Sequence, residues 1–186
     1  MNSIKPDFNL SRFNLQMRLV VESDAEDIIR LRCNPKTNRY LSSTSTNIDS
    51  QVSWIKEYKV RESEGTDYYF CFIYQDKVVG LTRLYHITED SFTFGSWVFD
   101  DNLPYYIPIA GAIMTRDLAF FELGKSIEKE VDGTNENNKG VISFSKMCGM
   151  VFDGFRLVDG DKFMTGYLLK DVYIKNREKI IKILPN

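Results

Sequence analysis

Cysteine, histidine and proline are all scarce in this 186-residue sequence, with three, one and five copies respectively. Cys33, Cys71 and Cys148 lie far apart, are odd in number and form no C-x-x-C pair. The sequence therefore predicts neither a disulfide framework nor a zinc site. The single histidine, His86, cannot form a cluster of metal ligands, so we expect no bound metal.

Long apolar runs are also lacking. No stretch is long and apolar enough to cross a bilayer, and the first residues, MNSIKPDFNLSRF, have no apolar core of a signal peptide. We therefore expect a cytoplasmic protein with no membrane partner. The net charge of −2 argues against a broad nucleic-acid-binding surface.

What is present is an ordinary globular composition, with 43% apolar and 27% charged residues. A chain of this length can bury a substantial core, and we find no linker or repeat. The simplest organisation is one domain over residues 1–186.

The N-terminal half predicts a strand, two helices and three further strands. Residues 1–10 have the character of a loose lead-in, and residues 13–21 alternate as a half-buried strand. A capping box at Ser23–Glu26 starts a helix that Pro35 ends. A second helix is expected at 48–62. Antiparallel strands follow at 68–74, 77–87 and 91–99.

The segment from Ser91 to Gly149 predicts a strand–helix–strand–helix unit. After the strand comes a loop, DNLPYYIPI, whose prolines disfavour a helix interior. A helix is expected from Ala110 to Gly124, then the strand SIEKEV, then a helix that Asn135 or Asn138 opens. A hairpin over 151–169 and a basic helix complete an α/β protein.

Two short patterns accompany this order of elements. Asn138, Val141, Ile142 and Gly149 match N-x-x-(small or β-branched)-I-x-x-x-x-K-x-G-F, although methionines replace its lysine and phenylalanine. Glu130-Val131 with Asn135 matches E-V-x-x-x-N. The chain thus resembles the GNAT N-acetyltransferases, in the ribosomal-protein-acetyltransferase branch related to amino-sugar enzymes. The resemblance implies a mixed, centrally splayed sheet with helices on both faces.

The resemblance also implies acetyl-CoA as co-substrate. Its pantetheine arm would lie at the splay, against Ser96, Trp97 and Val98. Its pyrophosphate would bind a small-residue loop whose best register is 107–112, where Ala110, Gly111 and Ala112 permit close backbone approach. The alternative is that these small residues serve helix packing. Either Asn135 or Asn138 takes the position of the family's CoA-binding asparagine.

Acid–base chemistry is harder to assign. In many GNAT enzymes a tyrosine four residues before the glycine that ends the second helix acts as the general acid. Ser145 occupies this position in the present sequence. Two residues are candidate general bases: His86, because imidazole titrates near neutral pH, and Glu130, at the carboxyl end of the parallel strand. We favour Glu130.

The function predicted on these grounds is transfer of an acetyl group from acetyl-CoA to a primary amine, without a covalent enzyme intermediate. The ending GFRLVDGDKFMTGYLL resembles the closing hairpin of amino-sugar enzymes, which favours a nucleotide-linked amino sugar as acceptor. Two alternatives stay open: a protein or peptide N-terminal acetyltransferase, and a non-catalytic acyl-CoA-binding module. The expected partners are CoA and a small amine, and assembly into a homodimer is left open.

Overall fold

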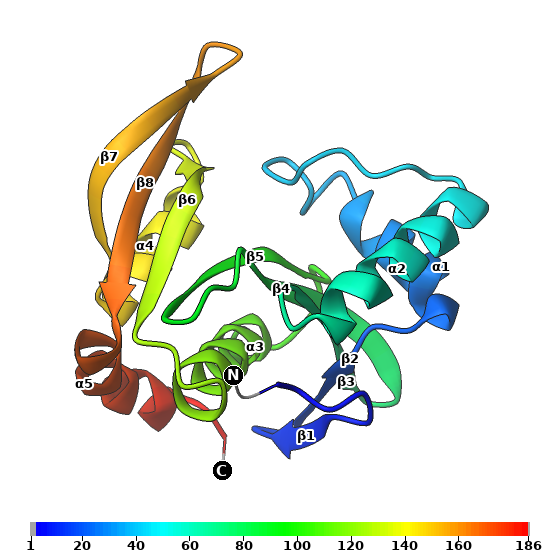
Figure 1. The fold of residues 1–186 in the computed structure, drawn as a ribbon, viewed down its shortest axis with the longest axis horizontal. Coiled ribbons are helices and arrows are strands. Elements are labelled where there is room, and N and C mark those ends of the chain that lie inside the picture. Colours follow the sequence, from blue (N-terminus) through cyan, green and yellow to red (C-terminus); the bar gives the residue numbers. More distant parts are fainter. Residues whose placement is uncertain (1–2, 186) are drawn as a thin grey trace.

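An eight-stranded mixed sheet runs through residues 3–185, the part of the chain that the computed structural model describes (Figure 1). Its strands are β1 (Asn9–Arg12), β2 (Leu15–Leu19), β3 (Tyr68–Tyr74), β4 (Lys77–Tyr85), β5 (Ser91–Phe99), β6 (Ile127–Asn135), β7 (Val151–Val158) and β8 (Asp161–Leu169). They lie in the order β1-β2-β3-β4-β5-β6-β8-β7. Only β5 and β6 are parallel neighbours in this part of the chain.

Helices cover both faces of the sheet, as the resemblance implied. They are α1 (Ala25–Arg32), α2 (Ile48–Ser63), α3 (Tyr106–Asp117), α4 (Lys139–Cys148) and α5 (Lys170–Ile180). One buried cluster joins α1 and α2 to the sheet, and another joins the opposite face to α3, α4 and α5. No helix in residues 3–185 is long and apolar enough to cross a membrane.

Strand β3 shows how the sequence produces two cores. Successive side chains of a strand point to opposite faces. Phe70 and Phe72 therefore pack in the cluster with α3, whereas Tyr69 and Cys71 pack in the cluster with α1 and α2. Burial on both faces explains why YYFCFIY is a continuous apolar run rather than an alternating one.

The sheet splits between β5 and β6. These strands pair only at Ser91–Ile127 and Phe92–Glu128, and beyond this point the two halves diverge (Figure 1). Next to the split, β5 bulges: Ser96 and Trp97 both lie opposite Thr82, and Ser96 has a φ of 50°. The predicted central splay is confirmed.

The predicted N-terminal lead-in is wrong at its end, because a strand begins at Asn9. Residues 9–12 form β1, and Phe13 and Asn14 make the turn to β2, both at positive φ. Strand β1 lies at the sheet edge and is mostly exposed, so its sequence, NLSR, carries no apolar alternation that would identify it. The following helix, α1, begins at Ala25 after a single turn over Glu22–Asp24, and its N-cap is Asp24 rather than the predicted Ser23.

The predicted phosphate loop is also wrong, because residues 107–112 belong to α3. Pro108 lies in the first turn, where a helix tolerates a residue without an N–H. Ala110, Gly111 and Ala112 are buried, and a Cβ on Gly111 would lie 2.4 Å from the Phe99 ring. Their N–H groups lie within the helical hydrogen-bond ladder, so packing explains the small side chains.

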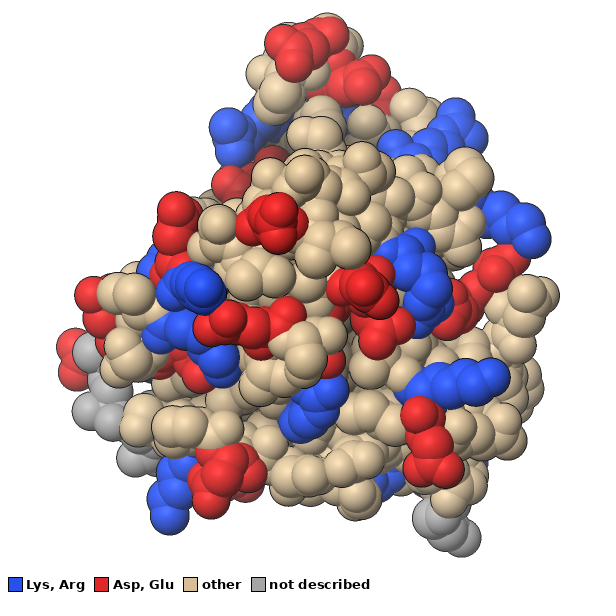
Figure 2. All heavy atoms as spheres, turned by 90° about the vertical axis from the view of Figure 1, so that its right-hand side faces the viewer, with Lys and Arg blue, Asp and Glu red and all other residues tan. Residues whose placement is uncertain are grey.

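Figure 2 views the molecule from the side of α1 and α2. Basic and acidic side chains are interspersed over this face, and several form pairs. Arg30 bonds both Asp27 and Asp100, and Lys36 bonds Asp101 at 2.7 Å. These pairs connect α1 and the loop after it to the end of β5.

Candidate active site

A cavity of about 430 Å³ lies where β5 and β6 diverge. Strands β4 and β5 form one wall, β6 and α4 form the other, and the loop after α1 adds Tyr40, Leu41 and Ser42. We call it the splay cavity. The predicted site residues that line it are Ser96, Trp97, Glu130, Asn135, Asn138 and Ser145.

Glu130 is held at this cavity by an irregularity in β6. The strand pairs with β8 through Glu130–Gly166 and again through Thr134–Met164, so the residues between them bulge out of register. Burial raises the pKa of the Glu130 carboxyl to about 8, and the negative charges of Glu128 and Asp132 act in the same direction. The carboxyl therefore titrates near neutral pH.

His86 does not line the splay cavity. It follows β4 at a φ of 49°, and its Nε2 lies 3.3 Å from Oδ2 of Asp132 on β6. Both side chains are about half exposed. The pair therefore joins the two halves of the sheet, while Glu130 is the predicted base that faces the cavity.

Tyr85 is a cavity residue that sequence reasoning missed. Burial is the main cause that raises the pKa of its phenol, and the charges of Asp132 and Glu130 raise it further. A Cβ on Gly95 would lie 2.8 Å from the Tyr85 ring, so the ring covers this glycine beside the β5 bulge. A glycine inside a strand signals such close approach, but the sequence does not reveal the approaching side chain.

Helix α4 brings Asn138 and Ser145 to the cavity. Asn138 is its N-cap, with a side chain that accepts a hydrogen bond from the Val141 N–H, and Gly149 ends it at a φ of 103°. Asn135 instead ends β6, where its Oδ1 accepts from the Asn137 N–H at 2.9 Å. Asn138 is therefore the residue that opens the helix, and both asparagines line the cavity.

The residues predicted at the splay divide between two environments. Trp97 donates from Nε1 to the Pro108 carbonyl at 3.0 Å, and its ring centroid lies 4.8 Å from that of Phe144 on α4. It is both a cavity wall and a core contact. Val98, however, is buried in the cluster with α1 and α2, so its side chain faces away from the cavity.

A buried ion pair lies beside the split. Arg116 of α3 donates to both carboxylate oxygens of Glu128 at 2.8 and 2.9 Å, and both side chains are about 1% exposed. The sequence alone does not reveal that Arg116 and Glu128 are partners, because they lie on different elements. The pair holds β6 against α3 at the last paired residues of the parallel strands.

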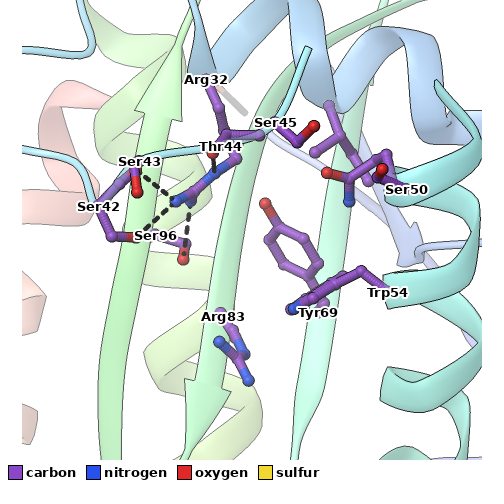
Figure 3. Close-up of a pocket in the computed structure, with 12 residues that line it drawn as sticks. Arg32, Ser42, Ser43, Thr44, Ser45, Ser50, Trp54, Tyr69, Arg83 and Ser96 are labelled. Carbon is purple, nitrogen blue, oxygen red and sulfur yellow. Dashed lines mark hydrogen bonds between the residues drawn. The ribbon is translucent and has the colours of Figure 1, made fainter. Parts of the chain in front are cut away.

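A second, smaller cavity of about 240 Å³ lies between the sheet and the pair α1 and α2 (Figure 3). It shares Arg32, Ser42, Arg83 and Ser96 with the splay cavity. We call it the hydroxyl cavity because of its serine and threonine lining.

The family model of the acetyltransferase (GNAT) domain matches residues 14–151. The chain belongs to the GNAT acetyltransferase family. It is similar to a solved structure described as apo FdhC, a nucleotide-linked sugar GNAT, with 31% identity and a TM-score of 0.79 over 96% of this chain and 99% of that one. A comparison with curated protein sequences finds no match.

More distant structures share the GNAT fold. One is Mycobacterium smegmatis RimJ in complex with CoA-disulfide, at 16% identity and a TM-score of 0.75 over 90% of this chain and 88% of that one. Another is spermidine N-acetyltransferase from Vibrio cholerae in complex with CoA and spermine. It has 17% identity and a TM-score of 0.74 over 88% of this chain and 99% of that one. The fold and acetyltransferase family predicted from sequence are thus confirmed.

Proposed function

We propose that this GNAT protein transfers an acetyl group from acetyl-CoA to a primary amine by direct attack. The observation that carries the proposal is the splay cavity, which holds a carboxyl group with a pKa of about 8, Glu130, between the diverging strands. A group that titrates near the working pH is suited to general base catalysis.

The amine nitrogen attacks the thioester carbonyl while Glu130, directly or through water, takes a proton from it. The carbon–sulfur bond then breaks, and the thiolate receives a proton. Tyr85 is our choice of donor, because its phenol lies in the same cavity as Glu130. Ser145 is the alternative donor. The products are an amide and CoA with a free thiol.

The pantetheine arm fits the region beside the β5 bulge. Ser96 and Trp97 lie outside the regular β4–β5 register, which leaves backbone groups for a ligand to bond. Asn135 and Asn138 face the same cavity from the other side. We retain these four residues as acetyl-CoA contacts. We do not retain Ala110, Gly111 and Ala112, whose N–H groups serve α3.

A nucleotide-linked amino sugar is our proposed acceptor. The 31% identity to the nucleotide-linked sugar GNAT extends over nearly the whole chain, and the hydroxyl cavity adjoins the splay cavity. A protein or peptide N-terminus is the second candidate, because the sequence also resembles the ribosomal-protein-acetyltransferase branch.

Thiol release from acetyl-CoA across a panel of amines tests the proposal. We expect release with nucleotide-linked amino sugars, little with peptides or spermidine, and loss of release in Glu130→Gln. Release that is fastest with peptides would assign the second candidate. Bound acetyl-CoA without release for any amine would instead indicate a non-catalytic acyl-CoA-binding module.

A further inference from the structure

The hydroxyl cavity is lined by side chains that can donate hydrogen bonds. Its hydroxyl-bearing residues from the loop after α1, from α2 and from the β5 bulge are Ser42, Ser43, Thr44, Ser45, Ser50 and Ser96. Trp54 and Tyr69 add aromatic walls (Figure 3). No acidic side chain is among the residues that line it.

Arg32 lies where this cavity meets the splay cavity, and its charge has no acidic partner within the described residues. Its guanidinium donates from Nε to Thr44 Oγ1 at 2.6 Å, from Nη2 to Ser42 Oγ at 2.8 Å and from Nη1 to Ser96 Oγ at 3.3 Å (Figure 3). Arg83, the other arginine of the lining, is instead paired with Asp67.

The neutral partners of Arg32 have a consequence for ligands. A hydroxyl that accepts a hydrogen bond from Arg32 must direct its own proton elsewhere. Thr44, Ser42 and Ser96 can therefore each donate a hydrogen bond to a ligand that binds beside the guanidinium. An anion bound among them would meet charge and several O–H groups together.

Tyr69 supplies an independent sign of a ligand. Its side chain is about 1% exposed, and its hydroxyl makes no hydrogen bond of normal geometry within residues 3–185. Burial raises the pKa of this phenol, and the nearby Arg32 guanidinium acts against that shift. Figure 3 shows this hydroxyl directed toward Arg32 and Thr44. Buried polar groups almost always have partners, so an orphan that borders a cavity indicates a site that a ligand completes.

We propose that the hydroxyl cavity binds a phosphate group of the acceptor, with Arg32 as the cation and Tyr69 and the serine and threonine hydroxyls as donors. A phosphate offers three or more acceptor oxygens in a tetrahedral arrangement, which matches donors that converge from several elements. A carboxylate offers only two, in one plane. The inference rests on the proposed function for the identity of the ligand as the acceptor.

Calorimetric titration of nucleoside diphosphates tests the proposal directly. The protein is first saturated with CoA, so that phosphate sites for CoA are occupied, and UDP and dTDP are then titrated beside uridine, thymidine and acetate. We expect binding of the diphosphates and none of the nucleosides or acetate. Binding of acetate in preference to the diphosphates, or no binding of the diphosphates, would overturn the proposal.

Arg32→Gln should weaken diphosphate binding by about tenfold or more, the scale of a lost charge-assisted hydrogen bond. Arg39→Gln is the matched control, since Arg39 is exposed on the loop after α1 and does not line the cavity. It makes the same charge change and should leave binding unaltered. Equal weakening of diphosphate binding in both variants would show that only the net charge of the protein matters, and would contradict a phosphate site at Arg32.

Tyr69→Phe separates ligand binding from folding. Removing an unpaired buried hydroxyl should raise the melting temperature of the free protein while it weakens diphosphate binding. Tyr58→Phe is the contrast, because the Tyr58 hydroxyl bonds Glu62 and accepts from the Tyr69 N–H, so its loss should lower the melting temperature. This test remains decisive if Arg32→Gln does not fold. Unchanged affinity in Tyr69→Phe would count against the proposal.

Together with the thiol-release panel, the binding experiments distinguish failure of the proposed acetyltransferase activity from failure of the proposed phosphate site. Diphosphate binding that depends on Arg32, without thiol release from any amine, would keep the phosphate site and reject the enzyme. Acetylation of unphosphorylated amines, with no diphosphate binding to the CoA complex, would keep the enzyme and reject the phosphate site.

Discussion

At the scale of single residues, the environment of Glu130 decides its proposed role. Burial and two neighbouring carboxylates raise the pKa of Glu130, so its basic form becomes populated as the pH rises toward 8. The rate of acetyl transfer should rise with pH through an inflection near 8. In Glu130→Gln the rate should fall by about a hundredfold and this inflection should disappear. Rates at saturating amine from pH 6 to 9 measure both effects.

His86→Ala is the control for this prediction. His86 lies against Asp132 and does not itself line the splay cavity, so its loss should cost much less. A larger loss in His86→Ala than in Glu130→Gln would transfer the role of base to the histidine.

The same shift predicts how stability depends on pH. The folded protein holds the Glu130 proton between the ordinary value of 4.5 and about 8, whereas the unfolded chain releases it. Folding therefore binds a proton in this window, and the contribution of Glu130 to the unfolding free energy falls as the pH rises through it. Denaturant titrations at several pH values should show a flatter profile in Glu130→Gln.

Tyr85 and Ser145 are the two candidate proton donors. If Tyr85 protonates the thiolate, Tyr85→Phe should lower kcat by about a hundredfold, and Ser145→Ala should stay within a few-fold of the unsubstituted protein. Both substitutions remove one hydroxyl and no charge, so each serves as a control for the other. The opposite ranking in steady-state kinetics would make Ser145 the donor.

At the scale of elements, Arg116 and Glu128 fasten α3 to β6 at the split. Removing one partner of a buried ion pair leaves the other charge without compensation, which costs about 3–5 kcal/mol. Glu128→Gln should lower the unfolding free energy by this amount in urea titrations. Glu26→Gln, at an exposed position of α1, should change it little. Similar values for the two variants would show that the pair contributes nothing to stability.

The elements that sequence predicted well carry local signals. The hairpin β3–β4 turns at Gln75 and Asp76, both at positive φ, and α4 is bounded by an asparagine cap and a left-handed glycine. The start of α3 was missed because Pro104 and Pro108 have the character of a loop, although a first helical turn accepts proline.

The candidate site was only partly visible in the sequence, for a physical reason. Glu130 was found because the end of the predicted strand SIEKEV is a local feature, although β6 continues past it to Asn135. Tyr85, Arg32 and Tyr69 become site residues only when strands and helices distant in sequence meet around the two cavities. The environment of the Tyr69 hydroxyl depends on which groups the fold brings within hydrogen-bond reach, which no sequence pattern reports.

At the scale of the whole molecule, polar contacts connect the two halves of the sheet across the split. The loop after α1 reaches the far half, where the Tyr40 hydroxyl donates to the Asn137 carbonyl at 3.0 Å. His86 and Asp132 make a second connection. A ligand that fills the splay cavity would add contacts to both halves and bind only the folded chain.

Acetyl-CoA should therefore raise the melting temperature. At a concentration about a hundredfold above Kd, a ligand specific to the folded state stabilises it by roughly 2.7 kcal/mol, which is several degrees for a protein of this size. The nucleotide portion alone, 3′,5′-ADP, lacks the pantetheine arm that would lie between β5 and β6, so it should give a smaller shift. Differential scanning fluorimetry measures both. An unchanged melting temperature at millimolar acetyl-CoA would contradict the proposed co-substrate.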